Sequence, residues 1–317
     1  MVHAGTRRKS GLPERVPEAS GAPRCFICSR GCRPAPGEKG YCGLRENREG
    51  KLVHLAGMPS RGVLEYYFDP LPTNCVADWV CPVREEPYFG KKNLAVFYGA
   101  CTLNCLFCQN WQHRSLAGRL YPGVSSAALA GNVDANTACI CFFGGDPAPQ
   151  VPHALNASRK ALAQNPGLKI CWETSGLISD VFFSKIMALA SRSGGTIKFD
   201  LKAYNKHLYF ALTGGDNGQV FKNFARCARF SREEKRTLAV ASTLLVPGYI
   251  TADEVYEIAS FIAQYDPDTP YSLLGFYPHF QMKDLPLTSR TEAEACYRAA
   301  KRAGLRRVRL ANEHLLR

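Results

Sequence analysis

The 317-residue chain has no long hydrophobic run. Its longest apolar stretch, residues 238–246, stops at Pro247-Gly248 and is far shorter than the roughly 20 residues that a membrane-spanning helix needs. The first 20 residues are polar and contain Arg and Pro, so they lack the apolar segment of a secretory leader. Internal repeats and low-complexity tracts are absent too. These absences argue against a membrane protein or a repeat array, and we expect a soluble, cytoplasmic protein with no membrane partner.

Negative charge is also scarce, because 27 Asp and Glu stand against 40 Lys and Arg and the formal net charge is +13. Residues 1–24 contribute +3 of this charge, from five basic and two acidic side chains. A basic surface suits RNA, an acidic protein partner or a phosphorylated substrate, but an ordinary solvated surface can be equally basic. Charge therefore leaves the partner open. If RNA binds, the expected phosphate contacts are Arg298, Lys301, Arg302, Arg306, Arg307 and Arg309.

Cysteine, by contrast, is abundant, with 14 residues that are mostly clustered, which favours metal in a reducing compartment over disulfides. The central group is Cys101-x3-Cys105-x2-Cys108, which follows the apolar run 94–98. A loop at the end of a strand is where parallel α/β folds place their chemistry. Three thiolates on one short loop suit a four-iron cubane with one open iron. Zinc, with His113 as the fourth ligand, is the alternative.

The same loop carries an aromatic residue, Phe107, directly before the last cysteine of the motif. This pattern resembles the cluster loop of radical S-adenosylmethionine (SAM) enzymes. The resemblance implies a [4Fe–4S] cluster whose open iron binds the amino and carboxylate groups of SAM. It further implies that an electron from the cluster cleaves SAM to a 5′-deoxyadenosyl radical, which abstracts a hydrogen atom from the substrate.

A second cysteine group, Cys25, Cys28, Cys32 and Cys42, spans eighteen residues near the N-terminus. Gly and Pro turns separate these thiols, and few apolar residues lie between them, so a metal is the expected core of a small module. The spacing suits zinc slightly better, but it also suits a second iron–sulfur cluster. A redox-reactive segment without metal is the remaining alternative.

The other cysteines carry weaker signals. Cys75 and Cys81 form a pair that could complete the N-terminal site or bind an auxiliary cluster, but we interpret them as two isolated thiols near the cluster face. The remaining five fall among apolar neighbours and are predicted to be small core residues; they are Cys139, Cys141, Cys171, Cys227 and Cys296.

From residue 94 onward, strand-like apolar runs alternate with helical periodicity. Six such alternations indicate right-handed βαβ units and a parallel sheet, and the radical SAM resemblance implies the same α/β class, a partial (βα)6 TIM-like barrel. We expect a disordered tail at 1–22, a Cys-rich module and irregular bridge at 23–93 with hairpin character around residues 51–55, and the barrel at 94–317. Two of the expected helices begin with capping boxes, Thr251-x-x-Glu254 and Ser289-x-x-Glu292. The expected strands are residues 94–98, 138–143, 168–172, 196–201, 238–246 and 271–277, with a seventh at 307–310.

Further motifs follow the expected strands. The turn Gly144-Gly145-Asp146 resembles the Gly-Gly-Glu motif of radical SAM enzymes, whose backbone receives the SAM amino group, although Asp stands here in place of Glu. Glu173 follows the third strand, in a stretch like the Asp-Thr-Asn-Gly motif of glycyl-radical-enzyme activating enzymes. After the sixth strand, Tyr277 or His279 could reach the pocket.

The fourth strand ends in Lys198-Phe-Asp200-Leu-Lys202, and alternation places its three charged residues on one face. This stretch resembles the Asp-Leu-Lys motif of the activating enzymes. By that resemblance Asp200 and Lys202 lie at the SAM pocket, and Glu173 could join Asp200 in a monovalent-cation site. A structural salt bridge at the barrel rim is the alternative.

Over residues 24–317 the chain is most similar to radical SAM proteins of the AmmeMemoRadiSam kind, related to pyruvate formate-lyase activating enzyme. The shared marks are the N-terminal cysteine spacing, Cys108-Gln-Asn-Trp111 and the ending 304–308. The Cys75 segment departs from that pattern. We expect a radical SAM oxidoreductase that acts on a protein or peptide, with RNA modification or a non-enzymatic iron–sulfur protein as alternatives. A flavodoxin- or ferredoxin-type protein is the expected electron donor.

Overall fold

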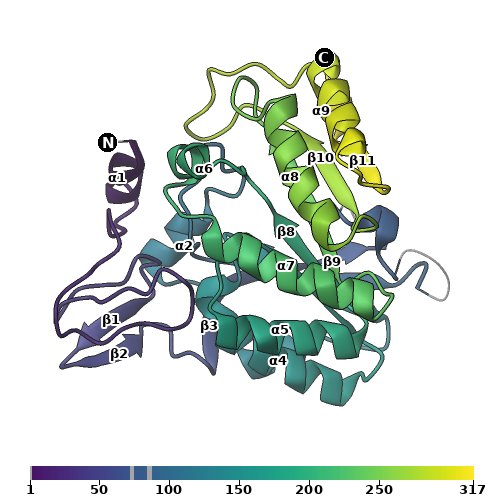
Figure 1. Ribbon diagram of the computed structural model, residues 1–317. Helices are drawn as coiled ribbons and strands as arrows, with labels where there is room; N and C mark the ends of the chain where they lie inside the picture. Colours follow the sequence, from purple (N-terminus) through teal and green to yellow (C-terminus); the bar gives the residue numbers. More distant parts are fainter. Residues whose placement is uncertain (1, 72–74, 84–87) are drawn as a thin grey trace.

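The computed structural model of the protein describes residues 2–71, 75–83 and 88–317 (Figure 1). Strands are β1 (Arg45–Arg48), β2 (Lys51–His54), β3 (Arg61–Pro70), β4 (Lys92–Tyr98), β5 (Gly123–Ser125), β6 (Thr137–Gly144), β7 (Lys169–Thr174), β8 (Ile197–Asp200), β9 (Ala239–Leu245), β10 (Tyr271–Gly275) and β11 (Val308–Ala311). Helices are α1 (Val2–Arg8), α2 (His113–Arg119), α3 (Ser126–Ala130), α4 (Val151–Gln164), α5 (Asp180–Ser193), α6 (Lys206–Thr213), α7 (Gly218–Glu233), α8 (Ala252–Tyr265) and α9 (Arg290–Arg302), with 3-10 turns η1 (Asp78–Val80), η2 (Ala148–Gln150) and η3 (Glu313–Leu315).

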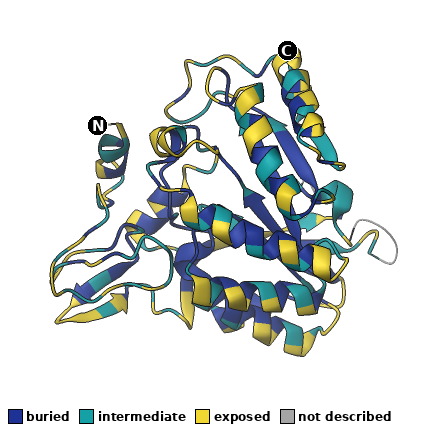
Figure 2. Cartoon of the chain, in the orientation of Figure 1, coloured by how far each residue is buried: buried dark blue, intermediate teal, exposed yellow. Residues whose placement is uncertain are grey.

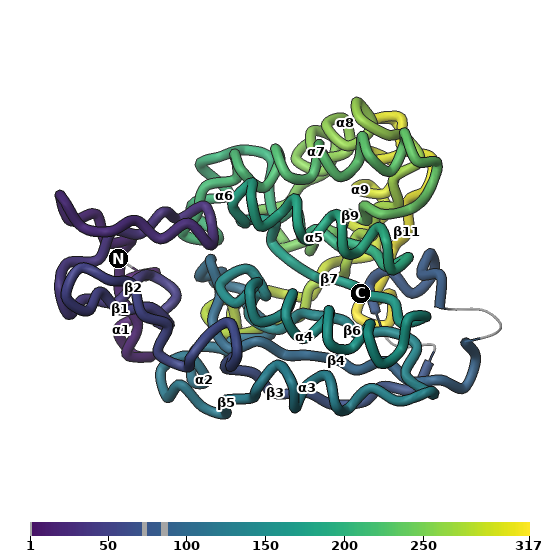
Figure 3. Tube along the Cα trace, turned by 90° about the horizontal axis from the view of Figure 1, so that it is seen from below, coloured from purple at the N-terminus to yellow at the C-terminus, as the bar shows by residue number. Residues whose placement is uncertain are grey.

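One nine-stranded sheet organises the molecule, in the order β11-β10-β9-β8-β7-β6-β4-β3-β5. Seven strands run parallel to one another: β4, β6, β7, β8, β9, β10 and β11. Strand β3 is antiparallel to both β4 and β5. The helices α4, α5, α7 and α8 lie side by side on the outside of the sheet (Figures 1 and 3). The predicted α/β class with a partial TIM-like barrel is therefore confirmed.

The apolar runs form the parallel strands because their side chains are buried on both faces of the sheet. Ile140 of β6 pairs in register with Ile170 of β7, and both are fully buried. The seventh run forms β11, and the sixth strand ends at Gly275, two residues before the predicted end. Figure 2 shows the covering helices with their buried sides toward the sheet and exposed residues outside.

The helix caps follow the sequence closely. Ser289 and Glu292 form the full reciprocal capping box at the start of α9. Thr251 caps α8 in only one direction, because the carboxylate of Glu254 instead accepts hydrogen bonds from the backbone of the loop after β8. Among the helices in the described ranges, none combines the length and the apolar character that a membrane crossing requires.

The stretch expected to be an irregular bridge contains the ten-residue strand β3, which pairs with β4 from Leu64 to Pro70. Alternation did not reveal this strand, because Tyr66, Tyr67 and Phe68 are all at least one third exposed. The hairpin expected near residue 51 is present as β1 and β2. Residues 72–74 and 84–87 of the bridge lie outside the described ranges.

The expected disordered tail is a second difference, since residues 2–8 form helix α1. This helix is anchored by long-range contacts that composition does not reveal. The ring of His3 bonds to the backbone oxygen of Asn104 at 3.1 Å, and the Asn104 side chain donates to Thr6 at 2.8 Å. Arg7 is 1% exposed and lies over the ring of Tyr41 at 3.5 Å. The N-terminal helix therefore packs on the loop that follows β4.

The connection from β3 to β4 crosses to the far edge of the sheet. The indole N–H of Trp79 donates to Ser272 at 3.1 Å, and the Ser272 hydroxyl donates to the backbone oxygen of Val76. Asp78 forms an ion pair with Arg309 at 2.6 Å. Ser272 and Arg309 are the second residues of β10 and β11. The connection thus lies across the end of the barrel where the parallel strands begin.

Candidate active site

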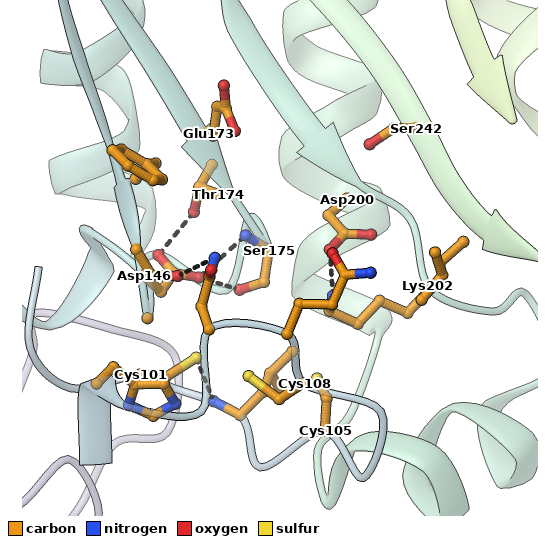
Figure 4. A pocket seen from close by; sticks show the side chains of 18 of the residues that line it. Cys101, Cys105, Cys108, Asp146, Glu173, Thr174, Ser175, Asp200, Lys202 and Ser242 are labelled. Atoms are coloured by element: carbon orange, nitrogen blue, oxygen red, sulfur yellow. Dashed lines mark hydrogen bonds and ion pairs between the residues drawn. The ribbon is translucent and has the colours of Figure 1, made fainter. Parts of the chain in front are cut away.

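A cavity of about 210 Å³ lies at the carboxyl ends of the parallel strands. The three cysteines of the loop after β4 (the cluster loop, residues 99–111) lie on one side of it (Figure 4). The ends of β6, β7 and β8 supply Asp146, Thr174 and Asp200. This is the edge of a parallel α/β fold where ligands bind, because the strand ends and their loops converge there.

The cluster loop is fixed by backbone hydrogen bonds to distant segments. Its Asn104 N–H donates to the backbone oxygen of Thr213 at 2.8 Å, and Leu106 N–H donates to Leu212 at 2.9 Å. The guanidinium of Arg114, 2% exposed, holds the Asn104 side-chain oxygen at 2.9 and 3.1 Å. The three thiols therefore sit on a rigid loop. Burial raises the pKa of Cys105 to about 12, so its thiolate needs a bound metal to form.

Gly144 and Gly145 allow the turn after β6 to touch the cluster loop. Gly144 has φ of 108°, and a Cβ on Gly145 would lie 2.1 Å from the backbone oxygen of Ala100. Gly145 N–H donates to Tyr98 O, and the next N–H donates to Ala100 O, both at 3.0 Å. Asn110 donates to the Gly144 oxygen at 3.0 Å. These glycines line the cavity and also set the distance between two loops.

Asp146 is 2% exposed, and its carboxylate accepts four hydrogen bonds. One oxygen accepts from Ala148 N–H and the Thr174 hydroxyl at 2.8 and 2.9 Å, and the other accepts from the N–H and hydroxyl of Ser175 at 3.0 and 2.5 Å. Burial raises the pKa of Asp146, although these bonds oppose the rise. The side chain ties the end of β6 to the end of β7, as the dashed lines in Figure 4 show.

Lys198, Asp200 and Lys202 line the same cavity, as strand alternation predicted. Lys202 pairs with Asp200 and lies 5.4 Å from the ring of Phe107. Burial opposes the charge on Lys202, but Asp200 and Cys105 outweigh it and raise the lysine's pKa. The cavity therefore holds a fixed ammonium and carboxylate pair beside the three thiols, and Figure 4 shows that pair pointing toward the loop.

The expected cation site of Glu173 and Asp200 is not assembled. Glu173 pairs with Lys198 at 2.5 Å, because β7 and β8 place these two residues side by side in register. Burial alone would raise the pKa of Glu173, but the Lys198 charge outweighs it and lowers the value. Each carboxylate thus has a lysine as its partner, and the arrangement contains two ion pairs instead.

Sequence reasoning missed several lining residues because their motif signal is weak. Ser242 of β9, Thr174 and Ser175 line the cavity with short polar side chains. His113, which the sequence suggested only as a zinc ligand, also lines the cavity. It is 1% exposed and has no hydrogen-bond partner on either ring nitrogen among the described residues. Burial lowers the pKa of His113 well below its usual range, so the ring is neutral. An orphaned buried imidazole in the cavity is the kind of group that a bound ligand satisfies.

The sixth-strand candidates are not among the residues lining the cavity. Tyr277 is 51% exposed, and its ring lies 6.5 Å from that of His279. Because β10 ends at Gly275, both residues are on the loop beyond the strand; Leu274 supplies the lining from β10.

The N-terminal cysteine group (Cys25, Cys28, Cys32 and Cys42) lines one small cavity of its own. Arg30 stacks on Tyr41 at 4.4 Å and donates to the backbone oxygen of Thr102 at 2.8 Å, which fixes this module against the cluster loop. The cavity walls include Thr102, so the two thiol groups are neighbours. The metal identity at the N-terminal group stays a prediction.

Within the described ranges, no three His, Cys, Asp or Glu side chains are placed to bind a single metal ion. A zinc site needs four ligands close around one point. In a four-iron cubane each thiolate binds its own iron, so the sulfurs stand farther apart than they do around a single ion. Among the described residues, the three thiols of the cluster loop and His113 are thus not placed around one zinc ion.

Cys75 and Cys81 are not the two isolated thiols that we expected. They line a separate cavity together with Cys139, Cys141 and Cys171, and no cysteine of the N-terminal group is among its lining residues. All five cysteines predicted as core residues are buried, including Cys227 and Cys296.

Comparison with known proteins points to one family. The profile of the radical SAM superfamily matches residues 95–262, slightly more than half of the chain. A putative glycyl-radical enzyme activating enzyme of Methanocaldococcus jannaschii is 29% identical over 139 residues, which are 43% of this chain and 49% of that protein. An uncharacterized protein of the same organism is 30% identical over 92 residues, 28% of this chain and 23% of that protein. The chain thus spans half or less of the length of these relatives.

Among solved structures, a radical SAM methyltransferase from Sphaerobacter thermophilus has a TM-score of 0.50 and 17% identity, covering 70% of this chain and 67% of that one. A domain of a pyruvate-formate lyase-activating enzyme from Bacteroides vulgatus has a TM-score of 0.44 and 18% identity, covering 54% of this chain and 98% of that one. At such identities the likeness to the methyltransferase concerns the fold alone.

Proposed function

Because the chain belongs to the radical SAM superfamily, we propose that Cys101, Cys105 and Cys108 hold a [4Fe–4S] cluster whose open iron binds SAM in the adjoining cavity. We further propose that the enzyme abstracts hydrogen from a protein or peptide. The observation that supports the site most is the convergence of three thiols, a lysine–carboxylate pair and an unpartnered imidazole on one cavity at the strand ends.

Bound cluster and bound SAM together supply the electron and the carbon radical for hydrogen abstraction. The protein's own residues bind SAM and orient it. The glycine turn at 144–145 brings its backbone to the cavity, because it packs against Tyr98 and Ala100 at distances that leave no room for a Cβ. Lys202, 9% exposed, offers its remaining ammonium protons to a carboxylate or a hydroxyl of SAM while Asp200 fixes its position.

Two further residues complete the proposed SAM site. His113 is neutral and has free ring nitrogens, so it can donate one hydrogen bond and accept another. Phe107, 5% exposed, packs beside the lysine and shields the cluster loop from water. Asp146, whose carboxylate is saturated by protein donors, serves as a positioning residue that keeps the turn after β6 in place.

A protein substrate is favoured by the similarity to a relative that is named as an activating enzyme. It is also favoured by ion pairs among the six basic residues that the sequence suggested as phosphate contacts. Arg306 is paired with Asp268 at 3.0 Å, and Arg309 is paired with Asp78 at 2.6 Å. Arg298 has Glu294 at 3.7 Å. Half of the six candidate phosphate contacts therefore already have acidic partners, which weakens the case for RNA. The excess positive charge instead suits an acidic electron donor of the flavodoxin or ferredoxin type.

The test is reductive SAM cleavage by anaerobically reconstituted protein, with dithionite as the reductant. We expect Cys105→Ala to abolish formation of 5′-deoxyadenosine, because two thiolates do not retain the cubane. Cys227→Ala is the matched control, since Cys227 is equally buried but lies on α7. Sustained 5′-deoxyadenosine formation by Cys105→Ala would refute the assignment. Deuterium transfer into 5′-deoxyadenosine from deuterated cell protein, and none from deuterated RNA, is the result expected for the substrate class.

A further inference from the structure

A second cavity, of about 100 Å³, lies inside the barrel below the candidate active site. It begins near Asn93 and Cys139, close to the start of β4 and β6, and it ends at Phe143, Glu173 and Lys198, which also line the active-site cavity. The β3–β4 connection covers it with Cys75 and Cys81. The volume is well above the ~10–15 Å³ that admits one water molecule.

The walls of this cavity are unusually rich in thiols. Seven cysteines lie outside the cluster loop and the N-terminal cysteine group, and five of these seven line this cavity. They make up five of its 13 lining residues, whereas a proportional share of the 14 cysteines among 317 residues would be fewer than one. Filling a barrel needs only apolar volume, which Ala or Val supply equally well. Packing therefore does not explain why the thiols gather here.

A buried positive charge faces these sulfurs. Lys198 is 3% exposed, and its ammonium lies 2.8 Å from the Cys75 sulfur and 3.2 Å from the Cys141 sulfur. Glu173 is the carboxylate that pairs with Lys198. If the surrounding thiols were deprotonated, the Lys198 ammonium would also balance part of their negative charge. An ammonium at this place lowers the cost of gathering thiolates in a low-dielectric interior.

The remaining thiols line other parts of the same cavity. Cys171 lies directly beside Cys141 in the register of β6 and β7, and Cys81 is close enough to Cys171 for a hydrogen bond. Cys139 donates its thiol to the Asn93 side chain at 3.2 Å, whereas Cys75 and Cys141 donate theirs to Glu173 at 3.5 and 3.6 Å and also contact Lys198. Four thiols from three parts of the chain thus line the cavity, and the fifth lies beside Asn93.

We propose that Cys75, Cys81, Cys141 and Cys171 hold an auxiliary iron–sulfur cluster, with Lys198 as the charge that compensates it. Among the described residues these thiols do not form a group placed around a single metal ion. Four thiols that line one cavity suit an iron–sulfur cluster, in which the four thiolates are distributed over two or four irons. With four protein thiolates the cluster has no open iron and does not bind SAM. Its ligands are all different from those of the proposed SAM cluster, so either assignment can fail without the other.

The test measures iron, acid-labile sulfide and zinc per chain in the full protein after anaerobic reconstitution. We expect the double variant Cys75→Ala/Cys81→Ala to lose about two or about four irons with equal sulfide, according to cluster type, and to lose no zinc. Cys139→Ala and Cys227→Ala are the matched controls and should keep the parent content. Unchanged iron in the double variant, loss of zinc in its place, or an equal loss in Cys139→Ala would each overturn the proposal.

A second measurement guards against a variant that loses iron by misfolding. In a protein with Cys101, Cys105 and Cys108 all replaced by Ala, dithionite should still produce an electron paramagnetic resonance signal that is separable from any signal of the N-terminal group. Adding Cys141→Ser should remove that signal while the circular dichroism spectrum and unfolding midpoint stay within a few degrees of the triple variant. Persistence of every signal after Cys141→Ser would contradict the ligand assignment.

Discussion

Replacing Gly145 with Ala tests whether the contact between the β6 turn and the cluster loop sets the active site. The added Cβ would lie 2.1 Å from the backbone oxygen of Ala100, 2.7 Å from the His113 ring and 2.8 Å from the Ala100 carbonyl carbon. Two of these neighbours are backbone atoms, so no side-chain rotation relieves the clash. Ala100 already has φ of 84° and directly precedes Cys101.

The size of the effect follows from that distance. Ordinary Cβ contacts begin near 3.4 Å, so the cluster loop must retreat by roughly 1 Å, and overpacking of this kind costs about 1–3 kcal/mol of the free energy of unfolding. A displacement of about 1 Å at reacting groups lowers rates by roughly 10²-fold. We therefore expect a modest loss of stability and a much larger loss of SAM cleavage.

The assay compares iron content, the rate of 5′-deoxyadenosine formation and the denaturant midpoint for Gly145→Ala and for Gly131→Ala. Gly131 ends α3 with φ of −65°, and a Cβ there meets nothing closer than 3.4 Å, so this control should be neutral or slightly stabilising. Parent-like cleavage and stability in Gly145→Ala would refute the reasoning, because they would mean that the two loops move apart without consequence.

Three other outcomes are expected. Asp146→Asn turns an amide donor toward a backbone N–H such as that of Ser175, so unfolding should become easier by about 2–4 kcal/mol in denaturant titrations, and parent-like stability would contradict the saturated carboxylate. Lys202→Met should weaken SAM binding, measured by calorimetry, by about 1–3 kcal/mol at unchanged iron content, whereas loss of folded protein with unchanged affinity would favour a structural salt bridge. Burial lowers the pKa of His153 to about 4, so the unfolded chain binds a proton below pH 6.5 that the folded chain refuses. Between pH 7 and 5 the fall in stability should therefore be about 2 kcal/mol smaller in His153→Gln than in the parent, because the buried His54 and His113 lower stability in the same way in both proteins.

The sequence alone was sufficient wherever the relevant atoms are close along the chain. The spacing of Cys101, Cys105 and Cys108 and the strand before them required no knowledge of distant residues. The parallel strands, the hairpin at β1 and β2 and the full capping box at Ser289 were likewise readable, because hydrophobic periodicity and capping act over a few residues. The alternation of side chains along β8 also predicted that Lys198 and Lys202 lie on the same face, and both line the active-site cavity.

Tertiary structure decided everything that depends on contacts between distant segments. Composition suggested a disordered tail at the N-terminus, yet α1 is held through Asn104, which lies 98 residues after Thr6. Glu173 was expected to share an ion with Asp200, but the register of β7 and β8 gave it Lys198 as a partner. Cys75 and Cys81 were predicted to be two isolated thiols, but they line a cavity together with three further cysteines. The fold brings Cys75 into contact with Lys198, which lies 123 residues later in the chain. Local spacing fixes only what a residue can do, whereas the order and register of the strands fix which residues it meets.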